Sequence, residues 1–453
     1  MSNELDRLHE EISEGAQSPV SGIGSAVDAG ELLTRSGRAR IRIELPAYML
    51  VQVAWFTAFG AQMVLFPYLL KNVLNVSGTL LGVAQMALAA PSVVFILLGG
   101  VVAERADGRW LLVLFHLLAG LPAAALGLAL QNGHLTYWML LVYALAMGTI
   151  GAFMMPARDS ILNEVVARRR MAGSDITLQQ GVAFATLAQF VAQIAGLWIG
   201  GMASDKGVWP LLFAQGGAVA AGALAAATMK STEMVQTGRD GFGSVFGDIA
   251  DGMKAVKADP VLFSMVASMF GVGVFVIGAF LVIIPIVNAD VYGHESGGLR
   301  NIFMTFWLGA SCSSVAVSQF KRFARPGRLM LVWQFLGSVG ILVMVGNAPY
   351  WVFLTLVFVW GLAGGVSIMM SRSIVQEAAP PKLLARVLSI YQLGFMGGAP
   401  IGAAFMGVLA DHVGPRLVVL APSIGMLVLI FWMIFFTPIW NMKGSSGELK
   451  VDD

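Results

Sequence analysis

Residues 260–287 read PVLFSMVASMFGVGVFVIGAFLVIIPIV, without one charged side chain. A helix rises about 1.5 Å per residue and the hydrocarbon of a bilayer is about 30 Å thick, so about 20 consecutive apolar residues cross it. This stretch is long enough and therefore predicts a transmembrane helix. Eleven further apolar stretches predict the same, namely 46–70, 79–102, 110–130, 136–155, 177–202, 209–229, 299–320, 329–345, 350–374, 388–409 and 416–437.

The overall composition agrees with a chain surrounded by lipid. It is 57% hydrophobic and 12% charged, with a mean hydropathy of +0.77, a balance that soluble globular domains do not show. A β-barrel would instead carry short alternating segments, which are absent. We therefore expect an all-α membrane protein of twelve transmembrane helices, each satisfying its own backbone within lipid.

Other classes of protein find no support in the motifs. The sequence carries no Walker loop, no zinc-protease or serine-hydrolase signature and a single cysteine, Cys312. We therefore expect no enzyme, no cofactor and no metal site. Its basic residues follow the expected topology, so nucleic-acid binding is not indicated.

The distribution of positive charge predicts the orientation. If both termini are cytosolic, only four of the 28 lysines and arginines lie on the opposite side, namely Lys71, Lys206, Arg300 and Arg416. Lysine and arginine favour cytosolic loops, so we expect both termini in the cytosol.

Two parts of the chain echo each other. SILNE at 160–164, in the loop expected after the fourth stretch, matches SIVQE at 373–377, after the tenth, and GGMASD at 200–205 matches GVLAD at 407–411. We expect two six-helix bundles at 46–229 and 260–438, as in transporters with parallel repeats. A disordered tail at 1–45, a linker at 230–259 with an amphipathic helix and a tail at 439–453 complete the expected organisation.

The stretch GGVVAERADGR at 99–109 resembles the Gly-x-Leu-Ala-Asp-Arg-x-Gly-Arg signature of the major facilitator superfamily, with Glu104 in place of the usual aspartate. This resemblance implies that Glu104, Arg105 and Arg109 form a latch between the two halves. A carboxylate facing a helix N-terminus would stabilise one conformation. The alternative is an ordinary charged loop.

PARDSILNEVV at 156–166 and the segment 407–416 resemble the enterobactin-exporter branch of that superfamily. The resemblance implies export of small amphipathic molecules from a bacterial cytoplasm by alternating access, driven by protons. It places the chain in the inner membrane. The rival hypotheses are an uptake permease for a nutrient or lipid-like solute, and a non-transporting receptor with the same fold.

Polar side chains are costly inside lipid and normally face a cavity or another helix. Gln189 and Gln193, four residues apart, share one helix face. The expected wall of the passage comprises Gln62, Gln85, Gln189, Gln193, Phe270, Trp307, Trp360, Tyr391 and Gln392. For each residue, ordinary helix packing is the alternative.

Proton coupling needs a group that titrates inside the passage, yet no acidic residue is expected deep within a span. The peripheral candidates are Asp205, Asp290 and Asp411 at span ends and Glu164 and Glu377 in loops. Coupling is therefore expected from the resemblance and not from these residues.

Overall fold

The computed structural model describes residues 35–171, 173–176, 178–230, 241–319, 323–343, 346, 348–380 and 383–443. Within these ranges the regular structure is helical and contains no strand, which confirms the all-α prediction. Ten helices there are long and apolar enough to cross a membrane, and Leu420–Phe436 is a shorter apolar helix. The count of twelve remains a prediction. Most of the expected tail at 1–45, and residues 444–453, lie outside the described ranges.

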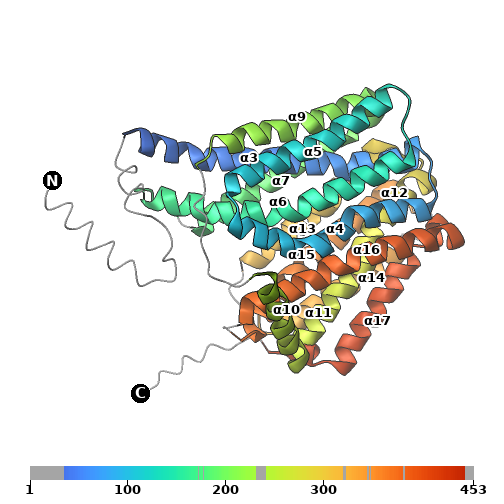
Figure 1. Cartoon of the computed structure of the whole chain (residues 1–453). Helices are drawn as coiled ribbons and strands as arrows, with labels where there is room; N and C mark the ends of the chain where they lie inside the picture. Colours follow the sequence, from blue (N-terminus) through green and yellow to red (C-terminus); the bar gives the residue numbers. More distant parts are fainter. Residues whose placement is uncertain are drawn as a thin grey trace, which may run out of the picture.

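The first half of the molecule packs as one bundle (Figure 1). Here α3 contacts α7 and α9, α4 contacts α6, and α5 contacts α9. The helices are α3 (Arg35–Tyr68), continued by the π-helical turn η1 (Leu69–Val73), α4 (Gly78–Arg105), α5 (Gly108–Gln131), α6 (Tyr137–Met171), α7 (Leu178–Gly201), α8 (Ala203–Lys206) and α9 (Val208–Ala227).

The second half repeats this arrangement. Here α13 contacts α15, α14 contacts α15 and α17, and α16 contacts α11 and α12. The helices are α11 (Pro260–Val272), η2 (Gly273–Ile277), α12 (Gly278–Ile286), η3 (Val287–Val291), α13 (Ser296–Ser318), α14 (Pro326–Val343), α15 (Tyr350–Ala378), α16 (Leu384–Leu417), α17 (Leu420–Phe436) and η5 (Pro438–Asn441). The first four form one continuous span.

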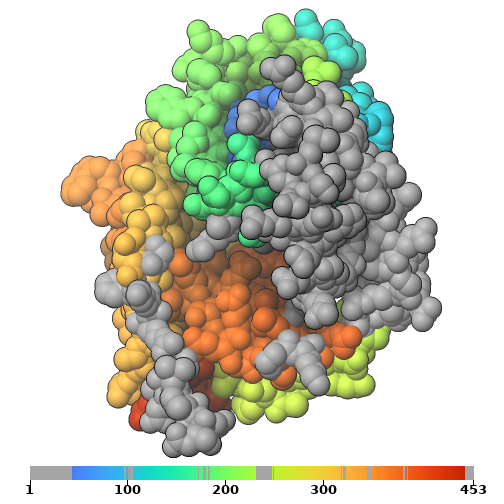
Figure 2. Space-filling model, turned by 90° about the vertical axis from the view of Figure 1, so that its left-hand side faces the viewer, coloured from blue at the N-terminus to red at the C-terminus, as the bar shows by residue number. Residues whose placement is uncertain are grey.

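Helix α10 (Gly241–Ala258) precedes the second half and contacts α11 and α16. We name the end of the molecule that holds α10 and the starts of α3 and α11 the linker end. The opposite end, where α4 begins and α16 ends, is the far end. Figure 2 looks onto the linker end, where green atoms of the first half lie above orange atoms of the second.

Several helices extend beyond the apolar stretches that predict them. Helix α3 already begins at Arg35, and α6 continues through Pro156 to Met171. The expected loop positions of Glu164 and Glu377 are wrong, because both residues lie on helices, α6 and α15. Apolarity marks the part of a helix that lies in hydrocarbon, whereas backbone hydrogen bonding continues into water.

Side-chain caps fix where several helices start. Ser77 accepts a hydrogen bond from the backbone nitrogen of Leu80 at the start of α4 (3.3 Å). Asp107 accepts one from Arg109 at the start of α5 (3.0 Å). Such caps satisfy backbone donors that a helix leaves unpaired, so they define the loops between spans.

Candidate functional site

The two halves meet at the far end through glycines on α4 and α16. A Cβ atom on Gly407 would meet the carbonyl of Gly78 and lie 2.9 Å from the Cα of Gly82. A Cβ on Gly82 would in turn lie 3.1 Å from the Cα of Gly407. Only glycine allows this backbone approach, so the contact is close without large interlocking side chains.

A carboxylate of the second half caps a helix of the first half at the same place. Asp411 accepts hydrogen bonds from the backbone nitrogens of Gly78 (2.7 Å) and Thr79 (2.8 Å) and from the Thr79 hydroxyl (2.6 Å). The positive end of the α4 dipole and its free N–H groups favour this negative charge. The sequence marked Asp411 only as a peripheral carboxylate.

Polar groups add to the far-end contact. Lys71 pairs with Asp290 across the halves at 2.8 Å. The Ser296 hydroxyl donates to the carbonyl of Gly201 (3.0 Å), and the Arg300 guanidinium lies 4.3 Å from the ring centre of Trp198. The polar contacts described between the halves therefore gather at the far end.

Tyr292, just beyond η3, belongs to the second half at this end. Burial raises the pKa of its phenol above the ordinary value, and the charge of Arg416 opposes the shift. The phenol therefore stays protonated near neutral pH and donates to the carbonyl of Ala348 (3.2 Å).

Three of the expected glutamines come together below this closed end. A cavity of about 90 Å³ between the halves is lined by Phe59, Gln62, Met63, Phe66, Pro67, Gln85, Leu88, Leu281 and Phe303. Gln62 and Gln85 are buried there, and the Oε1 atom of Gln85 has no hydrogen-bond partner among the described residues. Gln193 donates from Nε2 to the sulfur of Met63 (3.4 Å). This cavity is smaller than the roughly 300 Å³ that small-molecule pockets need, so the space between the halves is narrow here.

The other expected residues do not converge on this cavity. Gln189, one turn from Gln193 toward the linker end, is half-buried. Phe270 on α11 is exposed, whereas Tyr391 is buried, with its hydroxyl 2.6 Å from the Ser371 Oγ. Gln392, beside it, is exposed.

The two expected tryptophans lie within the second half. Trp360 is buried, with ring centres 5.8 Å from Phe280 and 5.4 Å from Phe306. Trp307 lies edge-on to Phe306 at 5.9 Å, and its indole nitrogen is buried without a partner among the described residues. Trp360 thus packs in the core of its bundle, while Trp307 offers an unused donor.

The residues expected to form the latch are only partly described. The side chains of Glu104 and Arg105 lie outside the part of the chain that the structure describes. Arg109 donates from Nη1 to the carbonyl of Met229 (3.2 Å) and lies 4.7 Å from the ring centre of Trp110. These contacts of Arg109 remain within the first half.

Sequence reasoning missed Arg158, which lies on α6 beyond the expected end of the fourth span. Arg158 is only 6% exposed. Nε and Nη2 both donate to Oδ1 of Asp159, at 3.1 and 3.0 Å, and Cζ lies 5.0 Å from the ring centre of Phe56. Arg158 could have been found from the sequence, because it lies three residues after Met155, the last residue of the apolar stretch. Apart from Pro156, nothing between these two residues indicates that the helix ends.

A second missed feature is a buried ion pair at the linker end of the first half. Glu44, 1% exposed, pairs with Nε of Arg168 at 3.0 Å and accepts the backbone N–H of Lys230 at 3.0 Å. It joins the start of α3, the end of α6 and the residues after α9. No local pattern could indicate it, because Glu44 and Arg168 are 124 residues apart.

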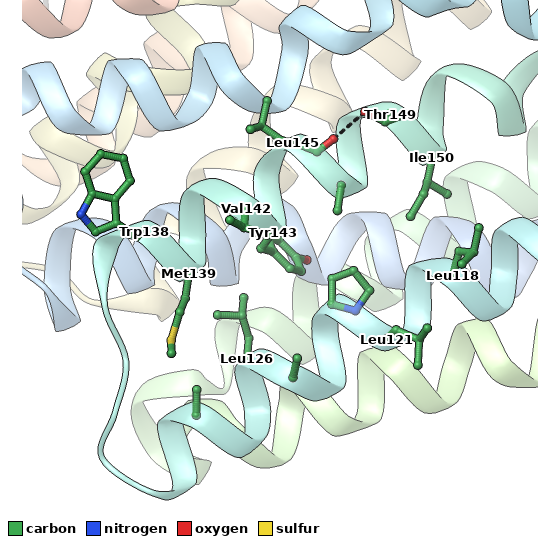
Figure 3. A pocket seen from close by; sticks show the side chains of 14 residues that line it. Leu118, Leu121, Leu126, Trp138, Met139, Val142, Tyr143, Leu145, Thr149 and Ile150 are labelled. Atoms are coloured by element: carbon green, nitrogen blue, oxygen red, sulfur yellow. Dashed lines mark hydrogen bonds between the residues drawn. The ribbon is translucent and has the colours of Figure 1, made fainter.

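A larger groove, about 930 Å³, lies on the first half between α5 and α6 (Figure 3). Its lining is apolar apart from Thr149 and Tyr143. Thr149 donates to the carbonyl of Leu145 (2.8 Å), and the Tyr143 hydroxyl accepts from Gln215 (2.9 Å). Leu121, Trp138 and Val142 there are exposed. This lining suits hydrocarbon chains of the bilayer and includes no residue of the second half.

Comparison with known proteins gives a family match over most of the chain. The profile described as Major Facilitator Superfamily matches residues 47–403 and 321–448. Enterobactin exporter EntS of Shigella flexneri is 23% identical over 193 residues, 42% of this chain and 47% of that protein. The Escherichia coli protein of the same name is 23% identical over 197 residues, with the same coverage. The match thus spans about half the length of these curated relatives.

Solved transporter structures share the fold. The nucleoside transporter NupG superposes with a TM-score of 0.66 at 13% identity, covering 86% of this chain and 98% of that one. A bacterial homolog of the human lysosomal transporter Spinster, inward-facing and unoccupied, gives 0.62 at 13% identity, covering 88% and 96%. A POT family transporter in complex with 5-aminolevulinic acid gives 0.64 at 11%, covering 89% and 96%. At these identities the likeness concerns the fold alone.

Proposed function

The chain belongs to the Major Facilitator Superfamily, and from that premise we propose that it is a proton-coupled secondary transporter that exports a small amphipathic solute. It works by alternating access: the two halves rock about a passage between them, which opens to each side of the membrane in turn. The name of the matched exporters supports the outward direction. The family points to a transporter and not to an enzyme.

One observation carries this proposal: the halves are joined at the far end by contacts that can separate as a unit. The contacts include the glycine backbones on α4 and α16, the Asp411 cap and the Lys71–Asp290 pair. When the halves separate, the polar groups freed from these contacts can bind water.

We place the linker end in the cytosol of a bacterium, with the chain in the inner membrane and both termini cytosolic. The charge distribution of the loops supports this orientation. With the far end closed, the passage then opens toward the cytosol, where a solute destined for export enters. Phe59 and Phe270, both about two-fifths exposed, would form apolar walls of this passage, one from each half.

Within the passage we assign solute contact to Gln62, Gln85, Gln189 and Gln193, and to the donor of Trp307. Gln62 and Gln85 line one cavity and Gln193 bonds to Met63 in its wall, which supports this set. Buried amides without full partners can exchange their hydrogen bonds with a solute at little cost. Tyr391, Gln392 and Phe270 remain proposed contacts nearer the linker end.

The test is flux in liposomes that contain the purified protein, with a pH gradient imposed across the membrane. Amphipathic solutes should move against the proton gradient, and collapsing the gradient with an ionophore should stop net transport. Accumulation of the solute in expressing cells would favour the uptake permease. A solute that binds without any flux would favour the receptor and contradict the transporter.

A further inference from the structure

Arg158 is a buried cation whose donors are incompletely used. Its guanidinium carries five N–H groups, and two of its nitrogens share a single carboxylate oxygen of Asp159. The third nitrogen, Nη1, is buried and has no partner among the described residues. Burying a charge is costly unless its hydrogen bonds are satisfied, so the free nitrogen marks a place for an acceptor.

The surroundings place this guanidinium next to the passage. Phe56 of α3 lies under it, and the ring of Phe56 meets that of Phe59 edge-on at 6.2 Å. Phe59 lines the glutamine cavity and is 41% exposed. Two aromatic rings of one helix therefore connect Arg158 with the cavity between the halves.

Asp159 shows which medium borders this face of α6. Its side chain is 67% exposed, although it belongs to a helix long enough to cross the membrane. A carboxylate does not face hydrocarbon without a large penalty, so this side of the pair borders water. Asp159 is thus accessible from an aqueous compartment, whereas Arg158 is buried against the ring of Phe56.

We infer that Arg158 binds an oxyanion of the solute, with Phe56 and Phe59 holding the solute's aromatic or apolar body. The ligand class is an amphipathic aromatic anion, such as a carboxylate attached to fused rings. Asp159 neutralises the guanidinium while the site is empty, and the solute's oxyanion competes with it for the same N–H groups. A guanidinium fork suits this exchange, because it pairs with two oxygens side by side. This inference rests on the proposed function and narrows its substrate.

The test compares two probes that share a ring system and differ in charge, 2-naphthoate and 2-naphthylmethylammonium. Their binding to the full-length protein in nanodiscs is measured by equilibrium dialysis. We expect the anion to bind at least about tenfold more tightly than the cation. Arg158→Gln should abolish this preference, whereas Asp159→Asn should tighten naphthoate binding several-fold because it removes the competing anion.

The opposite signs of the two variants separate ligand binding from a structural role, which would weaken binding in both. Arg328→Gln is the matched control, since Arg328 also lies 5.0 Å from an aromatic ring centre, that of Trp440, and should leave naphthoate binding unchanged. If Arg158→Gln fails to fold, the inference is tested by Asp159→Asn alone, which should bind naphthoate more tightly than the unaltered protein.

Three results would overturn the inference. The first is that the unaltered protein binds both probes equally or binds neither. The second is that Arg158→Gln binds naphthoate with an affinity within twofold of the unaltered protein. The third is that Asp159→Asn does not bind naphthoate more tightly than the unaltered protein. The proposed transport cycle has a separate readout, the distance between labels at residues 134 and 412 across the far end. Naphthoate binding without any change in the label distance and without flux would contradict the proposed transport function but would still support the anion site.

Discussion

The far end of the molecule and the linker end of the first half are both held by carboxylates, but in opposite ways. At the far end Asp411 is exposed and reaches from one half to the other. At the linker end Glu44 is buried and joins α3, α6 and the residues after α9, all in the first half. The contact that must break in the proposed cycle is thus near water, and the permanent one is away from it.

The physical reason lies in the cost of leaving each partner alone. A buried cation that loses its carboxylate has no water to replace it, which costs about 3–5 kcal/mol. At the far end the carboxylate itself is exposed, so its donors can bind water once the halves separate, and the net loss is about 0.5–1.5 kcal/mol for each hydrogen bond. Burial therefore distinguishes the permanent ion pair of the first half from the proposed gate at the far end, which opens at modest cost.

The largest effect is expected from Glu44→Ala. It leaves Arg168 buried without its main carboxylate partner and should lower the free energy of unfolding by about 3–5 kcal/mol. The apparent melting temperature of the purified protein, followed by tryptophan fluorescence, measures the loss. Asp251→Ala is the control, because it removes an exposed pair with Arg386 (3.2 Å), worth about 0–1 kcal/mol. Equal losses in both variants would contradict the contrast between the ends.

Gly407→Ala should act on the gate alone. The added methyl group meets the backbone of Gly78 and Gly82 when the far end is closed, so the closed state should lose about 1–3 kcal/mol. Spin labels at residues 134 and 412, in a Cys312→Ser background, should report a larger population of long distances.

The matched control for that variant is Gly397→Ala on the same helix. A Cβ at Gly397 meets nothing within 4 Å, so the distance distribution should match that of the parent. A shift of the same size in both variants would show that helix propensity, and not the close approach at residue 407, causes the change.

Asp411→Asn should destabilise the closed far end less than Gly407→Ala does. The amide keeps one acceptor but lacks the charge that favours two backbone N–H groups, so a loss of about 0.5–1.5 kcal/mol is expected. Hydrogen exchange of the amides at residues 78 and 79 should become faster by up to about tenfold. Asp205→Asn, also an exposed carboxylate at the far end, should leave these two amides unchanged; faster exchange in that variant would refute the specific cap.

Lys71→Gln should have the smallest effect. Its pair with Asp290 is partly exposed, and such pairs contribute about 0–1 kcal/mol. The label distances should therefore shift slightly at low salt and not at all near 1 M salt, where the screening length is about 3 Å. A shift larger than that of Asp411→Asn would reverse the ranking of the two contacts.

Much of the fold followed from local sequence patterns. Apolar runs indicated the spans, and the uncharged run from Pro260 is one continuous helical span to Val291 in the structure. The GGVVAERADGR stretch indicated the family that the profile match shows. These predictions were possible because bilayer crossing depends on the residues of one segment and not on its partners.

The candidate site followed only in part. Gln62, Gln85 and Gln193 were expected from their polarity within spans; in the structure Gln62 and Gln85 line one cavity, and Gln193 bonds to Met63 in its wall. Trp360 was expected at the passage by the same reasoning, yet it packs against Phe280 and Phe306. Polarity or aromatic character marks a residue for burial against protein, but it does not say which neighbour the residue meets.

The sequence by itself determined that this chain is an all-α membrane protein, and its two internal echoes predict a duplicated set of helices. Only the tertiary structure decided which carboxylate forms a buried ion pair within one half and which forms an exposed contact between the halves. Glu44 meets Arg168 across 124 residues, and Asp411 meets Gly78 across 333. Hydropathy is a property of single segments, whereas the strength of an ion pair or cap depends on the distance and burial that other helices impose.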